Sequence, residues 1–156
     1  MIFVTVGGQL PFDRLVRAVD EWAKECGRDD VFAQIGASDS PPHHIRWERF
    51  LSPPDFKAKA REAEVIVAHA GMGSILTAIQ LGKPIVIMPR RAHLGEHRND
   101  HQLATVSHLS GDVDIAAAAN ERELVELLHR LDELRSPTAR RSDEYSRLLS
   151  FLRDAL

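Results

Sequence analysis

A glycine-rich segment at positions 69–74, with the sequence HAGMGS, has the residue types of an anion site. It follows an apolar run and precedes a helical pattern, so it predicts a tight turn from a strand into a helix. The first turn of such a helix presents unpaired backbone N–H groups and a partial positive charge, which suit a diphosphate. Ser74 and Thr77 can add hydroxyl donors. Glycine-rich turns also arise in α/β folds for steric reasons alone, so both interpretations stay open for this segment by itself.

A second glycine turn, Gly7-Gly8, follows the first apolar run of the sequence. A loop at the same edge of a sheet could close over the same ligand, although a plain tight turn also explains this pair. The residues that we expect to bind a diphosphate are Gly7, Gly8, Gly71, Met72, Gly73, Ser74 and Arg90.

A polar segment, residues 89–102, follows the apolar run 85–88. Its arginines, at positions 90, 91 and 98, can each donate two hydrogen bonds to a phosphate. Sugar hydroxyls need partners that both donate and accept, and the segment ends in such side chains: Asn99, Asp100, His101 and Gln102. A solvated loop before a helix is the alternative, but the position after a strand and near the glycine turn favours a binding site.

Residues 93–97 match the H-x-x-E-H pattern of an inverted zinc protease motif. That chemistry requires a helix, whereas this segment contains Gly95 and follows a strand that ends in a proline. No convincing third ligand stands downstream, so we predict no metal site.

A dinucleotide-dependent oxidoreductase is the other class that a nucleotide-binding α/β sheet suggests. Its fingerprint should follow the first strand and contain a third glycine, which the run after Gly71-Met72-Gly73 lacks. The second apolar run ends in Gln34-Ile35-Gly36 rather than in an acidic residue. We therefore reject this class.

The segments that must position these residues alternate between short apolar runs and helical patterns. Strands are expected over 2–6, 31–36, 45–51, 65–68 and 85–88, and helices from about 11 to 27, 54 to 63 and 72 to 82. Buried strands separated by helices predict an α/β fold, a Rossmann-like doubly wound parallel sheet with ligands at the carboxyl ends of its strands. The C-terminal third reads as helical, with a capping box at Asn120 and Glu123 and an apolar stripe over 145–156. We expect one nucleotide-sugar-binding domain over 1–156, with 120–156 as a region where a partner docks.

The composition is that of a globular protein. The chain has 156 residues, 44% of them hydrophobic and 28% charged, with a net charge of -3, which gives no reason to expect binding to nucleic acid. A single cysteine excludes an internal disulfide and suits a reducing compartment. The sequence contains neither the pattern of a signal peptide nor an apolar stretch long enough to cross a bilayer.

Taken in order, five motifs make the sequence similar to the C-terminal domain of glycosyltransferase family 28. They are Thr5-Val6-Gly7, Gln34-Ile35-Gly36, the segment 69–75, Gly82-Lys83-Pro84 and the segment 98–104. The resemblance extends to about residue 106. It is greatest to small stand-alone members, namely the donor-binding subunit of the two-part N-acetylglucosaminyltransferase of the dolichol pathway and bacterial exopolysaccharide glycosyltransferase subunits.

The resemblance implies one half of a GT-B glycosyltransferase that uses a UDP-sugar. The other half, a membrane-anchored acceptor-binding subunit, would present a polyprenyl-linked saccharide. The chain would then be a cytoplasmic hexosyltransferase subunit, peripheral at the inner face of the membrane and active only in the complex. The resemblance also implies a role in exopolysaccharide synthesis and a reaction that inverts the anomeric carbon. It implies no tightly bound cofactor or metal.

The family also implies roles for single residues. Phe50 and Leu51 would flank the uracil, and His101-Gln102 would read sugar hydroxyls. Many members carry an acidic residue for the ribose where this chain has Thr77, and stand-alone relatives often have threonine where it has Gly8. The general base would lie on the partner subunit, with His69 as the local candidate. A self-sufficient enzyme and a non-catalytic nucleotide-binding or regulatory module remain as alternatives.

Overall fold

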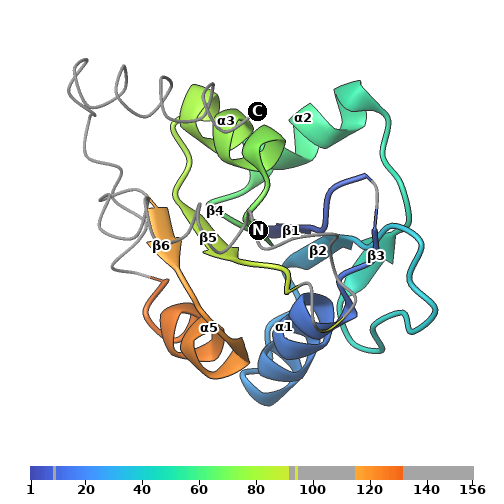
Figure 1. Cartoon of the computed structure of the whole chain (residues 1–156), viewed down its shortest axis with the longest axis vertical. Coiled ribbons are helices and arrows are strands. Elements are labelled where there is room, and N and C mark those ends of the chain that lie inside the picture. The colour runs from blue at the N-terminus through green and yellow to red at the C-terminus, as the bar shows by residue number, and fades with distance from the viewer. Residues whose placement is uncertain (9, 92–93, 95–114, 132–156) are drawn as a thin grey trace.

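The computed structural model describes residues 1–8, 10–91, 94 and 115–131. In this part of the chain six strands form one sheet, ordered β3-β2-β1-β4-β5-β6 (Figure 1). All of its neighbouring strands are parallel. The strands are β1 (Ile2–Thr5), β2 (Val31–Gln34), β3 (Arg46–Glu48), β4 (Val65–His69), β5 (Ile85–Met88) and β6 (Ile115–Ala117).

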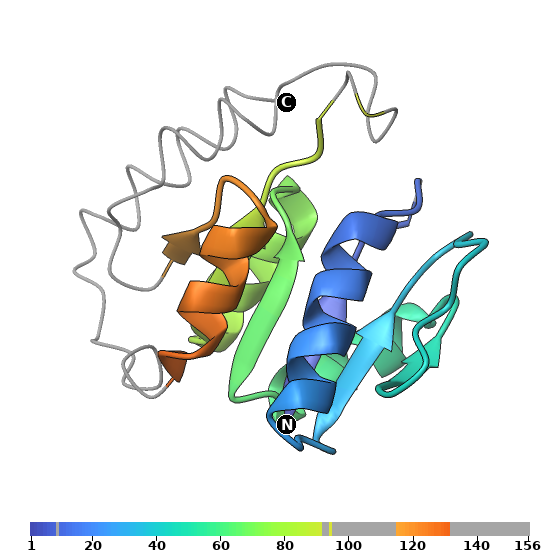
Figure 2. The ribbon, with the colours of Figure 1, turned by 90° about the horizontal axis from the view of Figure 1, so that it is seen from below.

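Helices cover both faces of the sheet. The helices α1 (Asp13–Glu25) and α5 (Glu121–Leu128) lie on one face, and α2 (Pro53–Glu62) and α3 (Met72–Leu81) lie on the other (Figure 1). Figure 2 shows α1 and α5 side by side on their face. Each face has its own apolar core, because strand side chains point alternately to opposite sides. The predicted Rossmann-like doubly wound parallel sheet is therefore confirmed.

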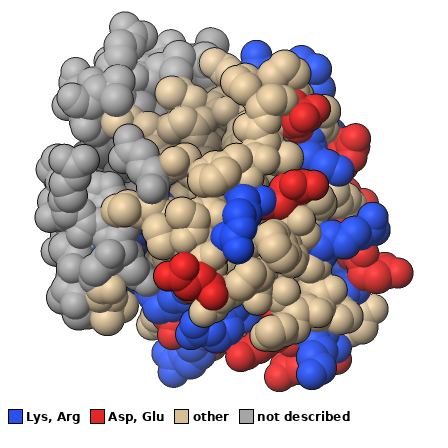
Figure 3. All heavy atoms as spheres, turned by 90° about the vertical axis from the view of Figure 1, so that its right-hand side faces the viewer, with Lys and Arg blue, Asp and Glu red and all other residues tan. Residues whose placement is uncertain are grey.

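The central strands are buried because their sequences are almost entirely apolar. β1 and β5 are buried at every residue and contribute to both cores. The expected apolar stripe of α1 packs in the core on its own side of the sheet. β3 is different, since its three residues are all exposed at the edge of the sheet. It is also shorter than the expected 45–51. On the face that includes β3, acidic and basic side chains are interspersed (Figure 3).

One strand contradicts the expectation of a purely helical C-terminal third. β6 pairs in parallel with β5 through Ile115, Ala116 and Ala117. Two of these residues are alanines, which favour helices over strands, so the sequence alone gives little sign of a strand here. One bond of the expected capping box is confirmed, since the Asn120 side chain accepts from the backbone N–H of Glu123 at 3.0 Å. The Glu123 carboxylate accepts from the N–H of Ala119, one residue before the N-cap, and not from that of Asn120.

The predicted stripe over 145–156, with the docking role expected for it, lies outside the described residues. Among the described helices, none is both long and apolar enough to cross a membrane.

Candidate functional site

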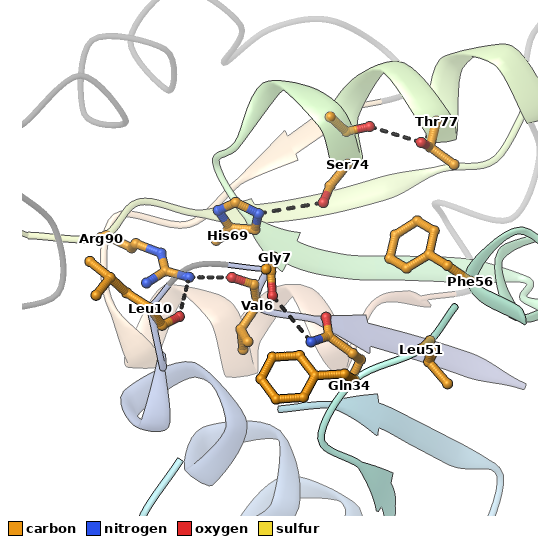
Figure 4. Close-up of a pocket in the computed structure, with 13 residues that line it drawn as sticks. Val6, Gly7, Leu10, Gln34, Leu51, Phe56, His69, Ser74, Thr77 and Arg90 are labelled. Carbon is orange, nitrogen blue, oxygen red and sulfur yellow. Dashed lines mark hydrogen bonds between the residues drawn. The ribbon is translucent and has the colours of Figure 1, made fainter. Parts of the chain in front are cut away.

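A cavity of about 500 Å³ opens where β1, β2 and β4 reach their carboxyl ends (Figure 4). The register places Thr5 beside both Gln34 and Ala68, so the turns that follow these strands meet at one edge. The cavity contains nine of the predicted site residues: Gly7, Gly8, Phe50, Leu51, His69, Gly73, Ser74, Thr77 and Arg90. It also contains four residues that we did not predict for the site: Val6, Leu10, Gln34 and Phe56.

The imidazole of His69 lies against the backbone of both glycine turns. A Cβ atom at Gly7 would stand 2.7 Å from Nε2 of His69, and one at Gly71 would stand 2.0 Å from Cε1. Both distances are far below van der Waals contact. Gly7 also has a φ of 80°, which L side chains rarely adopt. Two of the glycines are therefore required by the protein's own packing around His69.

Gly8 and Gly73 are different, although both line the cavity. In the described part of the chain, apart from the adjoining residues and the backbone of α3 itself, no atom lies within 4 Å of the place where a Cβ would stand at either residue. Neither residue has a positive φ. Packing among the described residues therefore does not explain why these two positions lack a side chain, and the expected approach of a ligand to their backbone stays a prediction.

The helix α3 begins at this edge of the sheet. Its N-cap is Gly71, which supplies no side-chain cap, and its first turn contains no acidic residue. The N–H groups at the start of a helix have no carbonyl four residues earlier to bind, and they carry a partial positive charge. Ser74 is buried with its hydroxyl oxygen 3.5 Å from Nε2 of His69. Met72 packs against the apolar core instead of lining the cavity.

The hydroxyl of Thr77 donates to the carbonyl oxygen of Gly73 at 2.8 Å. Its proton is thereby committed within the helix, but the oxygen can still accept a hydrogen bond. A ribose hydroxyl, which can donate, would fit this arrangement. The expected role of Thr77 stays a prediction.

Arg90 is 3% exposed and lines the cavity, yet its guanidinium points at the loop after β1. It donates to the carbonyl oxygens of Val6 and of Leu10, the latter at 2.8 Å (Figure 4). It also donates to the carbonyl oxygen of Pro11 at 3.2 Å. The same group stacks over the ring of Phe12. Arg91 likewise donates to a backbone carbonyl, that of Ala119. Arg90 therefore holds the first glycine loop in place, and its expected contact with a diphosphate stays a prediction.

One wall of the cavity is apolar. Phe50 and Leu51 follow β3, and Phe56 projects from α2 with its ring edge against Phe3 at 5.2 Å between centroids. Phe50 is 59% exposed at the mouth of the cavity. A flat heterocyclic base can pack on such a wall. Phe56 could not be predicted for the site, because its position reads as an ordinary face of the α2 helix.

Several predicted residues lie outside the described part of the chain. These are the expected sugar-binding residues Asn99, Asp100, His101 and Gln102, together with Arg98 and most of the H-x-x-E-H segment at 93–97.

A parallel sheet covered by helices on both faces, with glycine turns and a helix start around a cavity at its strand ends, is a Rossmann-like α/β domain. The sequence profile described as "Glycosyltransferase family 28 C-terminal domain" matches residues 1–155. The chain belongs to this family.

Proteins similar in sequence to this chain include several that carry the name UDP-N-acetylglucosamine transferase subunit ALG13. The protein of Mus musculus is 30% identical over 121 residues, which are 70% of this chain and 10% of the mouse protein. That of Yarrowia lipolytica is 26% identical over 130 residues, 73% of this chain and 66% of the yeast protein. The chain thus spans only a tenth of the length of the mouse relative.

The same fold occurs in solved structures. An NMR solution structure of ALG13 has a TM-score of 0.66 at 18% identity, with 95% of this chain and 94% of that chain covered. The crystal structure of MurG from Acinetobacter baumannii has a TM-score of 0.61 at 16% identity, with 97% of this chain and 49% of that chain covered. With the family assignment, these likenesses identify the fold as that of the C-terminal half of a GT-B glycosyltransferase.

Proposed function

We propose that the chain binds a UDP-linked hexose, or a derivative of one, and is the donor-binding part of an inverting glycosyltransferase. The observation that carries this proposal is the pair of cavity-lining glycines, Gly8 and Gly73, that packing among the described residues does not require. In the proposed complex the diphosphate lies between them, against the first-turn N–H groups of α3. The uracil packs on the apolar wall and the ribose lies near Thr77.

The proposed reaction is a direct displacement. A hydroxyl of the acceptor attacks the anomeric carbon of the donor, the bond from that carbon to the diphosphate oxygen breaks, and UDP leaves. Helix N–H groups that stabilise the leaving diphosphate lower the barrier, because they are fixed in position before its charge develops. The acceptor proton passes to a base, which we assign to the partner subunit, with His69 as the candidate within this chain.

We further propose a membrane-anchored partner that presents a lipid-linked saccharide at the cytoplasmic face. Support for a two-subunit enzyme comes from relatives that are themselves named as transferase subunits. Those relatives are also named for UDP-N-acetylglucosamine, which supports a UDP-hexosamine among the candidate donors. A role in exopolysaccharide synthesis rests on the sequence resemblance alone.

Calorimetric titration with UDP, UMP and uridine tests the donor site. We expect saturable binding of UDP, at least about tenfold tighter than that of UMP, because the second phosphate adds contacts to the helix start. Gly73→Ala is the informative variant. In a helix, alanine is more favourable than glycine by roughly 0.5–1 kcal/mol, so the variant should be no less stable than the wild type. The added methyl group should weaken UDP binding by about tenfold.

Gln80→Ala is the matched control, since Gln80 is an exposed residue of the same helix and does not line the cavity. It should leave UDP binding unchanged. Equal affinities of wild type and Gly73→Ala for UDP, or equal binding of UDP and uridine, would contradict the proposed site. Turnover of a UDP-sugar only after addition of the partner would support the subunit role, and binding without any transfer would favour a regulatory module.

A further inference from the structure

Gln34, the last residue of β2, is a buried polar side chain that lines the cavity and has no role in the proposed function so far. It is 4% exposed. Its Oε1 accepts a hydrogen bond from the hydroxyl of Thr5 at 2.7 Å. Its Nε2 donates to the carbonyl oxygens of Gly7 at 3.1 Å and of Arg49 at 2.9 Å. The opposite orientation of the amide would place Oε1 against two carbonyl oxygens, so these contacts fix the orientation.

These contacts join the two sides of the cavity. Gly7 belongs to the first glycine loop, while Arg49 directly precedes Phe50 and Leu51 of the apolar wall. Figure 4 shows the bond from Gln34 to Gly7 at the floor of the cavity. One buried amide thus links the loop expected at the diphosphate to the wall expected at the uracil.

Thr5 completes this link. Its hydroxyl donates to Gln34 and also lies 3.3 Å from the backbone N–H of Gly7, which donates to it. Both backbone polar groups of Gly7 are therefore held, the N–H by Thr5 and the carbonyl by Gln34. This pair keeps Gly7 in the left-handed conformation that brings the glycine loop to the cavity.

Gln34 has no donor left for a ligand. A primary amide carries two N–H hydrogens, and the contacts to Gly7 and Arg49 use both. Phosphate oxygens and the uracil carbonyls are acceptors that need a donor. Gln34 therefore acts on a nucleotide through the loops that it holds and not by donating to it.

We propose that Gln34, together with Thr5, is a positioning residue that sets the first glycine loop and the apolar wall at the spacing a nucleoside diphosphate requires. This inference rests on the proposed function, since it concerns the same cavity. Buried hydrogen-bonding residues usually contribute to stability. Here we assign to Gln34 and Thr5 a further effect, on the affinity of the folded protein for a nucleotide.

Gln34→Glu is the informative variant, because it keeps the size of the side chain and replaces the donor by an ionisable oxygen. Burial and the facing carbonyl oxygens should raise the pKa of the introduced carboxyl above the ordinary value of about 4.3. Ionised, the carboxyl repels both carbonyls. Protonated, it supplies one O–H donor in place of the two lost. We therefore expect the ratio of UDP dissociation constants, variant over wild type, to be about tenfold near pH 8 and to fall toward one near pH 5.5.

Two further variants complete the design. Gln34→Met removes the donors without adding a charge, so its UDP affinity should be reduced by a similar factor at both pH values. Asp20→Asn is the matched control. Asp20 is also buried and also holds a loop, accepting from the backbone N–H groups of His43, His44 and Ile45, but it does not line this cavity. It should lower the unfolding temperature and leave the UDP dissociation constant unchanged.

The outcomes separate the two proposals. Failure of the wild-type chain to bind UDP contradicts the proposed function. If the wild type binds and Gln34→Glu binds equally well near pH 8, the positioning role is wrong. A loss that does not recover toward pH 5.5 also overturns it. Should Gln34→Glu not fold, an unchanged UDP affinity of Gln34→Met is sufficient to reject the inference.

Discussion

Four glycines lie in the two turns at the carboxyl ends of β1 and β4. Two different reasons explain why these positions have no side chain. Gly7 and Gly71 leave room for the imidazole of His69, which a Cβ at either position would overlap. Gly8 and Gly73 leave room that no described protein atom fills. A single sequence pattern therefore combines a packing requirement with a requirement that we attribute to a ligand.

The packing requirement can be tested by a double-mutant cycle. Gly71 has a φ of -93°, so alanine meets no backbone strain there and its cost arises from the overlap with His69. Gly71→Ala should lower the free energy of unfolding by about 1–3 kcal/mol, the range for overpacking. In the His69→Ala background the same substitution should cost much less, as measured by urea denaturation. Additive effects, within about 0.5 kcal/mol, would contradict the proposed contact.

The sequence allowed most of the residues around the cavity to be predicted, because strand ends in a parallel sheet share one edge. The direction of a side chain could not be predicted in the same way. Arg90 reads as a phosphate ligand from its type and position, yet it donates to the carbonyls of the loop after β1. Gln34 belongs to a family motif and ends the second apolar run, but its sequence position did not predict a contact in the site. The signal that could have indicated its role is a polar residue at the end of an otherwise buried strand.

At the scale of elements, α3 differs from α2 and α5 in how it begins. Ser52 caps α2 by accepting from Asp55, and Asn120 caps α5 by accepting from Glu123. The start of α3 has a glycine at the N-cap and no side-chain cap. A helix start without such a cap, at the edge of a cavity, retains N–H groups for a ligand.

The contact between α1 and α5 gives a pH-dependent prediction. Arg14 pairs with Glu121 in the first turn of α5, and its hydrogen bond lowers the pKa of Glu121 below the ordinary 4.5. Because the pKa is lower in the folded state, the pair stabilises the fold above about pH 4.5, and this contribution is lost as the pH falls through the folded-state value.

Glu121→Gln should therefore lower the free energy of unfolding by roughly 0.2–1 kcal/mol near pH 7, as expected for an exposed ion pair. The difference from wild type should vanish in acid, where the carboxylate of the wild type is protonated. Glu126→Gln, on the exposed side of the same helix, leaves the Arg14 pair intact and serves as the control. A deficit of Glu121→Gln that persists unchanged at low pH would contradict the assignment.

The elements themselves were largely predictable from the sequence. β1, β2, β4 and β5 are mostly apolar runs, and β1, β4 and β5 are also rich in β-branched residues. Gly82 ends α3 in a left-handed conformation at the expected position. β6 was missed because two alanines carry no strand signal and its pairing with β5 is a long-range contact. The expected length of β3 was wrong. This strand lies exposed at the edge of the sheet, so no run of buried apolar residues marks its ends in the sequence.

At the scale of the whole molecule, the sheet and its two helical layers correspond to about half of a GT-B enzyme, as the 49% coverage of MurG indicates. In the proposed function this half binds the donor, and the acceptor comes from a second polypeptide. The binding energy of UDP then depends on one edge of the sheet alone. The proposed function therefore requires that UDP binds at this edge of the sheet.

The most direct test of this claim is an NMR titration of the ¹⁵N-labelled chain with UDP. We predict saturable shifts of the amide signals of Gly7, Gly8, Gly73 and Ser74, which surround the cavity at the strand ends. The amides of His43 and His44, beside the separate cavity near α1, should not move. Shifts that gather at His43 and His44, or no saturable shift at the glycine turns, would contradict the account.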